Sequence, residues 1–200
     1  MNTTTIWIVA RSVGFAALVL LTASVCIGAA VSGGERRDGR RLVWQYAHRW
    51  LAALGLTALA VHVGAILADS FAHVGVLGAL VPLQSAYRPL AVGLGTAAVY
   101  TALLVAITGW ARGRLARSAA AARRWRAVHL LAYVGWAAAM LHGLSAGSDS
   151  STPWARILYL ACLGAVAGAL ATRATALFAP ALLRRGNSRP TAQLVSEAGR

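Results

Sequence analysis

The chain has 200 residues, 58% of them hydrophobic, and a mean hydropathy of +0.64, which is too apolar for a soluble globular domain. Its formal net charge is +14, but the 19 basic residues, all of them arginine, stand in short clusters between apolar runs. That pattern sets membrane topology and argues against nucleic-acid binding, so we expect an all-α integral membrane protein.

Five apolar runs long enough to cross a bilayer follow one another along the chain. The first is expected to be retained rather than cleaved, because Arg11 follows the first residues of the run, whereas a signal peptide carries its charge before a shorter apolar core. The predicted transmembrane helices cover about residues 6–31, 42–68, 90–111, 127–146 and 154–178.

The segments between the helices differ in kind. Residues 32–41 read SGGERRDGRR and cannot enter the bilayer. Residues 70–89 are interrupted by two glycines and two prolines, which fits an interfacial loop that can hold one short helix. We expect residues 1–183 to form one transmembrane domain and residues 184–200 a disordered cytoplasmic tail.

Arginine counts in the short loops predict the orientation. The links after the first and third helices hold four and six arginines, whereas those after the second and fourth hold one and none. The arginine-rich links should be cytoplasmic, which places the N-terminus outside and the C-terminus inside the cell membrane. Arg11, Arg88 and Arg156 are then outer-side exceptions, whose long side chains can reach the headgroups.

Four of the five histidines lie in two of these helices. His48 and His62 are 14 residues apart on the second, and His129 and His142 are 13 apart on the fourth. Ionisable side chains inside membrane segments are candidates for function. The spacings correspond to rises of roughly 21 and 20 Å, so two helices that run in the same direction offer two imidazoles at each of two levels. Two axial imidazoles suit a haem iron that transfers electrons, and we expect two haems b between these helices.

Helix geometry adds a condition. At 100° per residue, His48 and His62 share a face of their helix, whereas thirteen residues turn the direction by about 140°. An ideal fourth helix would not aim His129 and His142 the same way. We therefore expect a local distortion, with Gly135 as the candidate position, or a different approach of the two porphyrins.

The residues resemble the ferric reductase-like transmembrane domain, which forms the membrane half of NADPH oxidases and ferric reductases. Standing alone, this domain is the haem subunit of a bacterial periplasmic methionine sulfoxide reductase system. The resemblance covers about residues 11–178 and rests first on the spaced histidines. Supporting words are AHRW and VHVG on the second helix, SAYRPL before the third, and RWRAVHLLAY and LHGL on the fourth.

The resemblance implies how the histidines pair. His48 and His129 would bind the iron of an inner haem, and His62 and His142 that of an outer haem. No catalytic residue is implied in this subunit.

Three arginines are candidates for haem propionates by charge-assisted hydrogen bonds, Arg88 at the outer haem and Arg49 or Arg126 at the inner one, although anchoring at the interface explains each equally well. The fifth histidine, His73, stands in the outer loop with no partner at ligand spacing.

The oxidases and ferric reductases of this family continue into flavin and nicotinamide domains, and this sequence has no GxGxxG after a strand. Electrons would come from a separate flavoprotein reductase, a bound flavin or a membrane quinol. The acceptor would be a ferric chelate, oxygen or an outer redox partner. The chain is thus expected to be the haem subunit of a membrane oxidoreductase.

Two other classes of protein stay open. One is a quinone-linked di-haem cytochrome of the b561 kind, which quinol reduction of the purified protein would favour. The other is a small transporter or assembly factor without redox activity, in which the histidines bridge helices as polar side chains. In that case, replacing His62 with alanine would change no visible absorbance.

Overall fold

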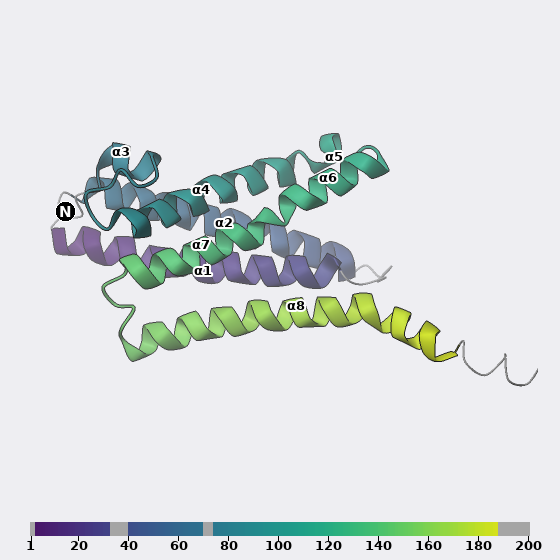
Figure 1. Ribbon diagram of the computed structural model, residues 1–200. Coiled ribbons are helices and arrows are strands. Elements are labelled where there is room, and N and C mark those ends of the chain that lie inside the picture. The colour runs from purple at the N-terminus through teal and green to yellow at the C-terminus, as the bar shows by residue number, and fades with distance from the viewer. Residues whose placement is uncertain (1–2, 33–39, 70–73, 188–200) are drawn as a thin grey trace, which may run out of the picture.

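The computed structural model describes residues 3–32, 40–69 and 74–187, with side chains at 5–31, 40–69 and 74–176. Within these ranges the regular structure is entirely helical (Figure 1). In chain order the helices are α1 (Thr3–Ser32), α2 (Arg40–Ala68), α3 (Gly75–Leu80), α4 (Pro89–Trp110), α5 (Arg112–Leu115), α6 (Ala119–His129), α7 (Leu131–Ala146) and α8 (Pro153–Asn187).

Five stretches of the described helices have the length and hydropathy needed to cross a membrane. They are Thr5–Val31, Arg40–Ala68, Pro89–Trp110, Ala119–Ala146 and Pro153–Ala176, so α6 and α7 together make one span. The predicted all-α class is confirmed, and these five stretches have the length and composition of the predicted transmembrane helices, although the fourth begins at Ala119 rather than near residue 127. Two spans begin where proline occupies the first helical turn, at Pro89 and Pro153, because proline is tolerated there and its fixed φ suits the helix.

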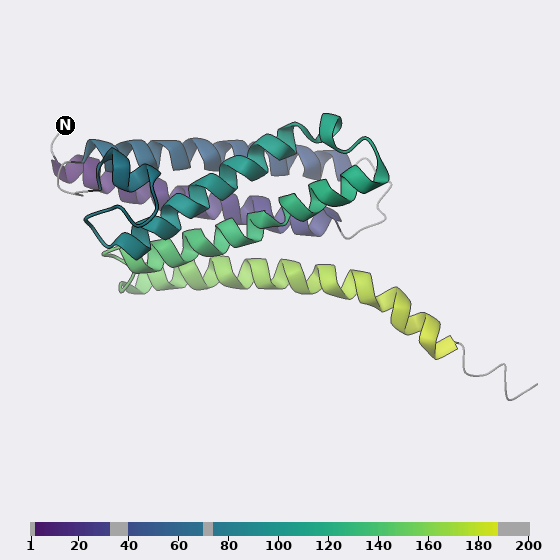
Figure 2. The same ribbon diagram turned by 45° about the horizontal axis from the view of Figure 1, so that its top comes forward.

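The spans pack as two helical pairs with a fifth helix at the side (Figures 1 and 2). α1 packs along α2, and α4 packs along α7, in the two most extensive contacts of the bundle. α8 packs on α1, and its C-terminal part extends beyond the other helices. α2 and α7 do not pack closely on each other within the described residues, although both carry histidines.

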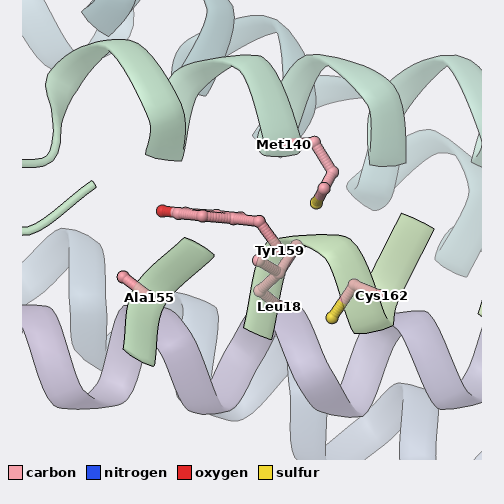
Figure 3. Close-up of a cluster of buried hydrophobic side chains, with 5 residues drawn as sticks. All are labelled: Leu18, Met140, Ala155, Tyr159 and Cys162. Atoms are coloured by element: carbon pink, nitrogen blue, oxygen red, sulfur yellow. The ribbon is translucent and has the colours of Figure 1, made fainter. Parts of the chain in front are cut away.

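A small apolar core joins α1, α7 and α8 on the side of the bundle where α8 packs. Leu18 of α1 and Met140 of α7 meet three buried residues of α8, Ala155, Tyr159 and Cys162. Figure 3 shows Met140 reaching from α7 towards the side of α8 that carries Tyr159 and Cys162. Ala155 has no exposed surface, so α8 approaches α1 closely at this point.

In the described part of the segment between α2 and α4, residues 74–88, the chain is irregular apart from the short helix α3, in line with the predicted loop that can hold one short helix. Thr96 of α4 donates to the carbonyl of Ala79 at 3.1 Å, and the Tyr100 hydroxyl donates to the carbonyl of Leu80. These bonds fasten the C-terminal end of α3 to α4. The predicted candidate His73 lies outside the described residues.

The fourth span is distorted at Leu130, which corrects the expectation that the distortion lies at Gly135. Leu130 separates α6 from α7, and the Tyr133 amide donates to the carbonyl of Leu130, three residues back. Gly135 serves close packing instead, because a Cβ built on it would lie 3.0 Å from the Cβ of Thr101 on α4. His129 is therefore the last residue of α6, directly before the break.

α8 continues to Asn187, beyond the end predicted near residue 178, and 188–200, the greater part of the predicted tail, lie outside the described residues. Arg11, whose side chain was expected to reach the lipid headgroups on the outer side, has partners within the protein. Its guanidinium forms an ion pair with Asp149, donates to the Ser148 hydroxyl and lies 4.3 Å from the centroid of the Trp7 ring. These contacts tie α1 to the loop between α7 and α8.

Candidate functional site

The four histidines of the membrane spans meet in two pairs, each of which joins α2 to the fourth span. The ring centroids of His48 and His129 are 6.3 Å apart, with an interplanar angle of 69°. Those of His62 and His142 are 6.4 Å apart, at 79°. The two levels expected from the sequence spacing are thus both formed by one ring from each helix.

Three of the four rings are held by a backbone carbonyl of the helix that packs behind them. Nδ1 of His62 lies 2.6 Å from the oxygen of Ala10, and Nδ1 of His48 lies 2.8 Å from that of Ser24. On the other side, Nδ1 of His142 lies 2.7 Å from the oxygen of Ala91. A carbonyl accepts, so Nδ1 carries the proton and donates. Nε2 of each ring then keeps a lone pair that can bind a metal.

A glycine lies against each ring and leaves room for it. A Cβ built on Gly14 would stand 2.8 Å from Nδ1 of His62, and one on Gly95 would stand 2.7 Å from Nδ1 of His142. The corresponding distance from Gly28 to the nearest atom of His48, Cε1, is 3.2 Å. Gly109 stands further off, with 3.5 Å to Cε1 of His129.

These glycines were missed by the sequence analysis, although the sequence carries a signal for them. Gly14 and Gly28 are 14 residues apart on α1, and Gly95 and Gly109 are 14 apart on α4, which matches the spacing of the histidines they face. At the three anchored rings, the accepting carbonyl belongs to the residue four positions before the glycine. Four residues is about one helical turn, so the glycine and the carbonyl lie on one face of their helix.

His129 differs from the other three. Its Nδ1 is buried and has no hydrogen-bond partner within the described residues. Its ring instead stacks on Trp125, with centroids 4.9 Å apart and an interplanar angle of 22°. The Trp125 Nε1 donates to the carbonyl of Thr108 on α4 at 3.0 Å, and the Arg112 guanidinium lies 4.9 Å from the centroid of the indole ring.

The ring separations of the two pairs are compatible with a metal shared by the two rings of each pair. Two imidazoles that bind one metal from opposite sides, with metal–nitrogen bonds of about 2.0–2.1 Å and ring radii of about 1.1–1.2 Å, have centroids about 6.2–6.6 Å apart. Both measured separations fall in this range. The described residues contain no group of three or more His, Cys, Asp or Glu that could hold a metal ion. Two protein nitrogens per site suit a metal whose other four ligands come from a planar macrocycle, as in haem.

The surroundings of α2 also agree with a bound group. Within α2, all of which the structure describes, Gly55 is the one buried residue, and both histidines are half-buried. The helix that supplies one ring to each pair thus has little protein packed around it, apart from α1. A flat apolar group between α2 and the fourth span would cover side chains there.

The three candidate arginines are all exposed. Arg49 follows His48 directly, and Arg126 precedes His129 by three residues, so both stand near the level of that pair. Arg88 caps the N-terminus of α4 in a left-handed backbone conformation, with φ of 39°, and donates to the carbonyl of Ser145. Ser145 is three residues from His142, so Arg88 stands near the level of the other pair.

Comparison of the chain with protein-family models, with curated proteins and with solved structures finds no match.

Proposed function

We propose that the chain is a di-haem b-type transmembrane electron-transfer protein, the membrane subunit of a ferric reductase-like oxidoreductase. The proposal is carried by one observation: two imidazole pairs with nearly equal separations, 6.3 and 6.4 Å, stand at two levels of the same pair of spans. Fourteen helical residues separate the levels by roughly 21 Å along α2, most of the hydrocarbon thickness of a bilayer.

The residues of the chain would act as ligands, orienting groups and insulation. Nε2 of His48 and His129 would bind one iron, and Nε2 of His62 and His142 the other. The Nδ1 bonds to Ala10, Ser24 and Ala91 fix the ring planes and increase the basicity of the ligating nitrogens.

When bound, the haems would supply irons that accept and release single electrons without a change of ligands. The apolar spans exclude water and ions from the region between the two levels.

The direction of transfer follows from the predicted orientation. Electrons would enter at the His48–His129 pair from a cytoplasmic-side donor, which would be a separate flavoprotein reductase, a bound flavin or a membrane quinol. They would leave at the His62–His142 pair towards a ferric chelate or an outer redox partner. Outward movement from a negative interior is assisted by about 2.3 kcal/mol per electron and 100 mV of membrane potential.

The first test is a reduced-minus-oxidised absorbance spectrum of the purified full-length chain, with haem counted per chain after expression with adequate haem supply. We expect two low-spin b-type haems. A chain without haem under these conditions would contradict the proposal. Reduction of the purified protein by a quinol, but not by a flavoprotein reductase, would instead assign it to the quinone-linked cytochromes.

Histidine variants test the pairing. His62→Ala and His142→Ala should each lower the haem content from two to one, because each removes an axial ligand from the same site. His73→Ala is the matched control, since His73 belongs to neither pair, and it should keep both haems. Full haem content in either His62→Ala or His142→Ala would show that the pairing is wrong.

A further inference from the structure

The His48–His129 pair is built differently from the His62–His142 pair. In the latter, both Nδ1 atoms lie within 2.7 Å of a backbone carbonyl oxygen. In the former, His48 has such a bond, to Ser24, but the buried Nδ1 of His129 has none within the described residues. The two sites therefore do not offer an iron the same pair of ligands, although the ring separations agree to 0.1 Å.

Stacking replaces the missing hydrogen bond at His129. The indole of Trp125 lies nearly parallel to the imidazole, at 22°, and its own Nε1 is bonded to the Thr108 carbonyl of α4. Arg112 lies over the same indole at 4.9 Å. Trp125 is thus fixed from two sides and can fix the plane of the His129 ring, which ends α6 directly before the break at Leu130.

The missing hydrogen bond at His129 and the positive charge of Arg112 act on the reduction potential of a bound iron in the same direction. A hydrogen bond from Nδ1 to a carbonyl makes the imidazole a stronger electron donor, which favours ferric iron, and His129 lacks it. A positive charge near the site favours the reduced state, which carries one more electron. The Arg112 guanidinium, 4.9 Å from the centroid of the indole that stacks on His129, adds such a charge. Arg49 and Arg126 also stand at this level, whereas Arg88 is the one candidate arginine near the other pair. Each effect raises the reduction potential of the His48–His129 site relative to the other site.

We propose that Trp125 and Arg112 are positioning residues of His129 and make the haem at the His48–His129 pair the more easily reduced of the two. The inference rests on the proposed function, because it requires a haem at each pair. Electrons that enter at this level would be held there until membrane potential or an acceptor draws them outward.

The test is a potentiometric titration of the purified full-length chain, followed by absorbance and by electron paramagnetic resonance of the low-spin ferric haems. We expect two reduction waves. His62→Ala should keep the higher wave, and His129→Ala should keep the lower one. If His62→Ala keeps the lower wave, this inference is wrong while the di-haem proposal stands, whereas a wild-type chain without haem contradicts the di-haem proposal itself.

Arg112→Gln should lower the potential of the higher wave and leave the other wave in place. Arg114→Gln is the matched control, because it removes the same charge two residues away, where Arg114 lies 6.0 Å from the ring of Trp110, which is not stacked on a histidine. Equal shifts of the higher wave in the two variants would show that Arg112 acts only as general surface charge, and would contradict a specific role for it at His129.

Trp125→Leu removes the stacking surface and should change the resonance g-values of the haem that His62→Ala retains. Trp125→Phe keeps an aromatic face without the Nε1–Thr108 bond and should change them less. Trp110→Leu is the control for loss of a tryptophan at the same end of the bundle. Unchanged g-values in Trp125→Leu, with both haems still bound, would contradict a positioning role for the indole.

Discussion

The glycines behind the histidine rings decide how closely α1 and α4 can approach the helices that carry the histidines. Gly95 is the tightest case among them, because a Cβ there would lie 2.7 Å from Nδ1 of His142, closer than a Cβ carbon approaches another atom without a bond. The ring cannot simply turn away, since the same Nδ1 donates to the carbonyl of Ala91. A single methyl group at this position must therefore displace either the helix or the imidazole of His142.

We predict that Gly95→Ala disturbs the haem at the His62–His142 pair and lowers haem content towards one per chain, because the methyl group separates Nδ1 from its carbonyl. Loss of such an outer-shell partner typically weakens metal binding about 10–100-fold. Haem counting and the resonance spectrum of the purified variant provide the measurement.

Two other glycines set the scale for this effect. Gly109→Ala should be milder, since its Cβ would stand 3.5 Å from His129, an ordinary contact. Gly164→Ala on α8 is the control, because a Cβ there meets no atom within 4 Å. A Gly95→Ala protein with the spectrum and haem content of Gly164→Ala would remove the glycine from the site.

At the scale of helices, the sequence predicted what hydropathy and spacing can reveal. The apolar runs predicted the five helical stretches that are long and apolar enough to cross a membrane, and the spacing of the histidines predicted the two levels at which the rings of α2 and the fourth span meet. The geometric argument also predicted either a local distortion between His129 and His142 or a different approach of the two porphyrins. The position of the distortion at Leu130 was not predictable, because neither a proline nor a glycine stands there to mark a break. Gly135 was the glycine that drew the prediction to the wrong place.

The backbone acceptors of the site were unpredictable for a different reason. The carbonyls of Ala10, Ser24 and Ala91 bind the histidine rings only because α1 packs on α2 and α4 on α7. Nothing in the local sequence of α1 specifies that partner. The matching glycine intervals were visible, but 20 glycines in the chain made any one interval weak evidence.

The link between α1 and the α7–α8 loop supports a prediction about stability. Asp149→Asn should lower the free energy of unfolding by about 1–3 kcal/mol, because the guanidinium of Arg11, whose side chain is 15% exposed, loses its counter-charge. Thermal unfolding in detergent, followed by circular dichroism, measures the effect through the melting temperature.

A double-mutant cycle isolates the pair from other effects of each change. The combined variant Arg11→Gln, Asp149→Asn should be destabilised by less than the sum of the two single variants, since neither charge is then left alone. Strictly additive losses would mean that the ion pair contributes no coupling energy and that other contacts hold the loop.

At the scale of the whole molecule, the helix arrangement and the distribution of the arginines together predict how the protein is oriented across the membrane. The basic residues of α5 and α6 lie at one end of the spans and the α7–α8 loop at the other. Because the arginine-rich end should stay in the cytoplasm, the His48–His129 pair is predicted on the inner side and the ion pair of Arg11 on the outer side.

Labelling of single cysteines tests this orientation. In a background with Cys26→Ala and Cys162→Ala, a membrane-impermeant maleimide should modify Ser151→Cys in intact cells and leave Ala119→Cys unmodified, because these exposed positions lie at opposite ends of the spans. Inverted vesicles should give the reverse result and serve as the control for reactivity. The opposite pattern in intact cells would invert the proposed direction of electron transfer.

The glycines and histidines of the site also recur along the chain at a nearly constant interval. Ala10, Gly14, Gly28 and His48 are followed 81 positions later by Ala91, Gly95, Gly109 and His129. After His48 the interval becomes 80, which relates Gly55 to Gly135 and His62 to His142. Gly55 and Gly135 both allow close packing of two spans. A Cβ on Gly55 would press on Leu21 of α1, and a Cβ on Gly135 would press on Thr101 of α4.

One residue is thus missing from the second series, and the break at Leu130 falls within the stretch where it is lost. The α1–α2 and α4–α7 hairpins have the pattern that duplication of a single ancestral hairpin leaves behind. Each hairpin supplies one imidazole to each level and completes neither. A protein with one such hairpin would have to associate with a second copy of itself to bring two imidazoles together at either level.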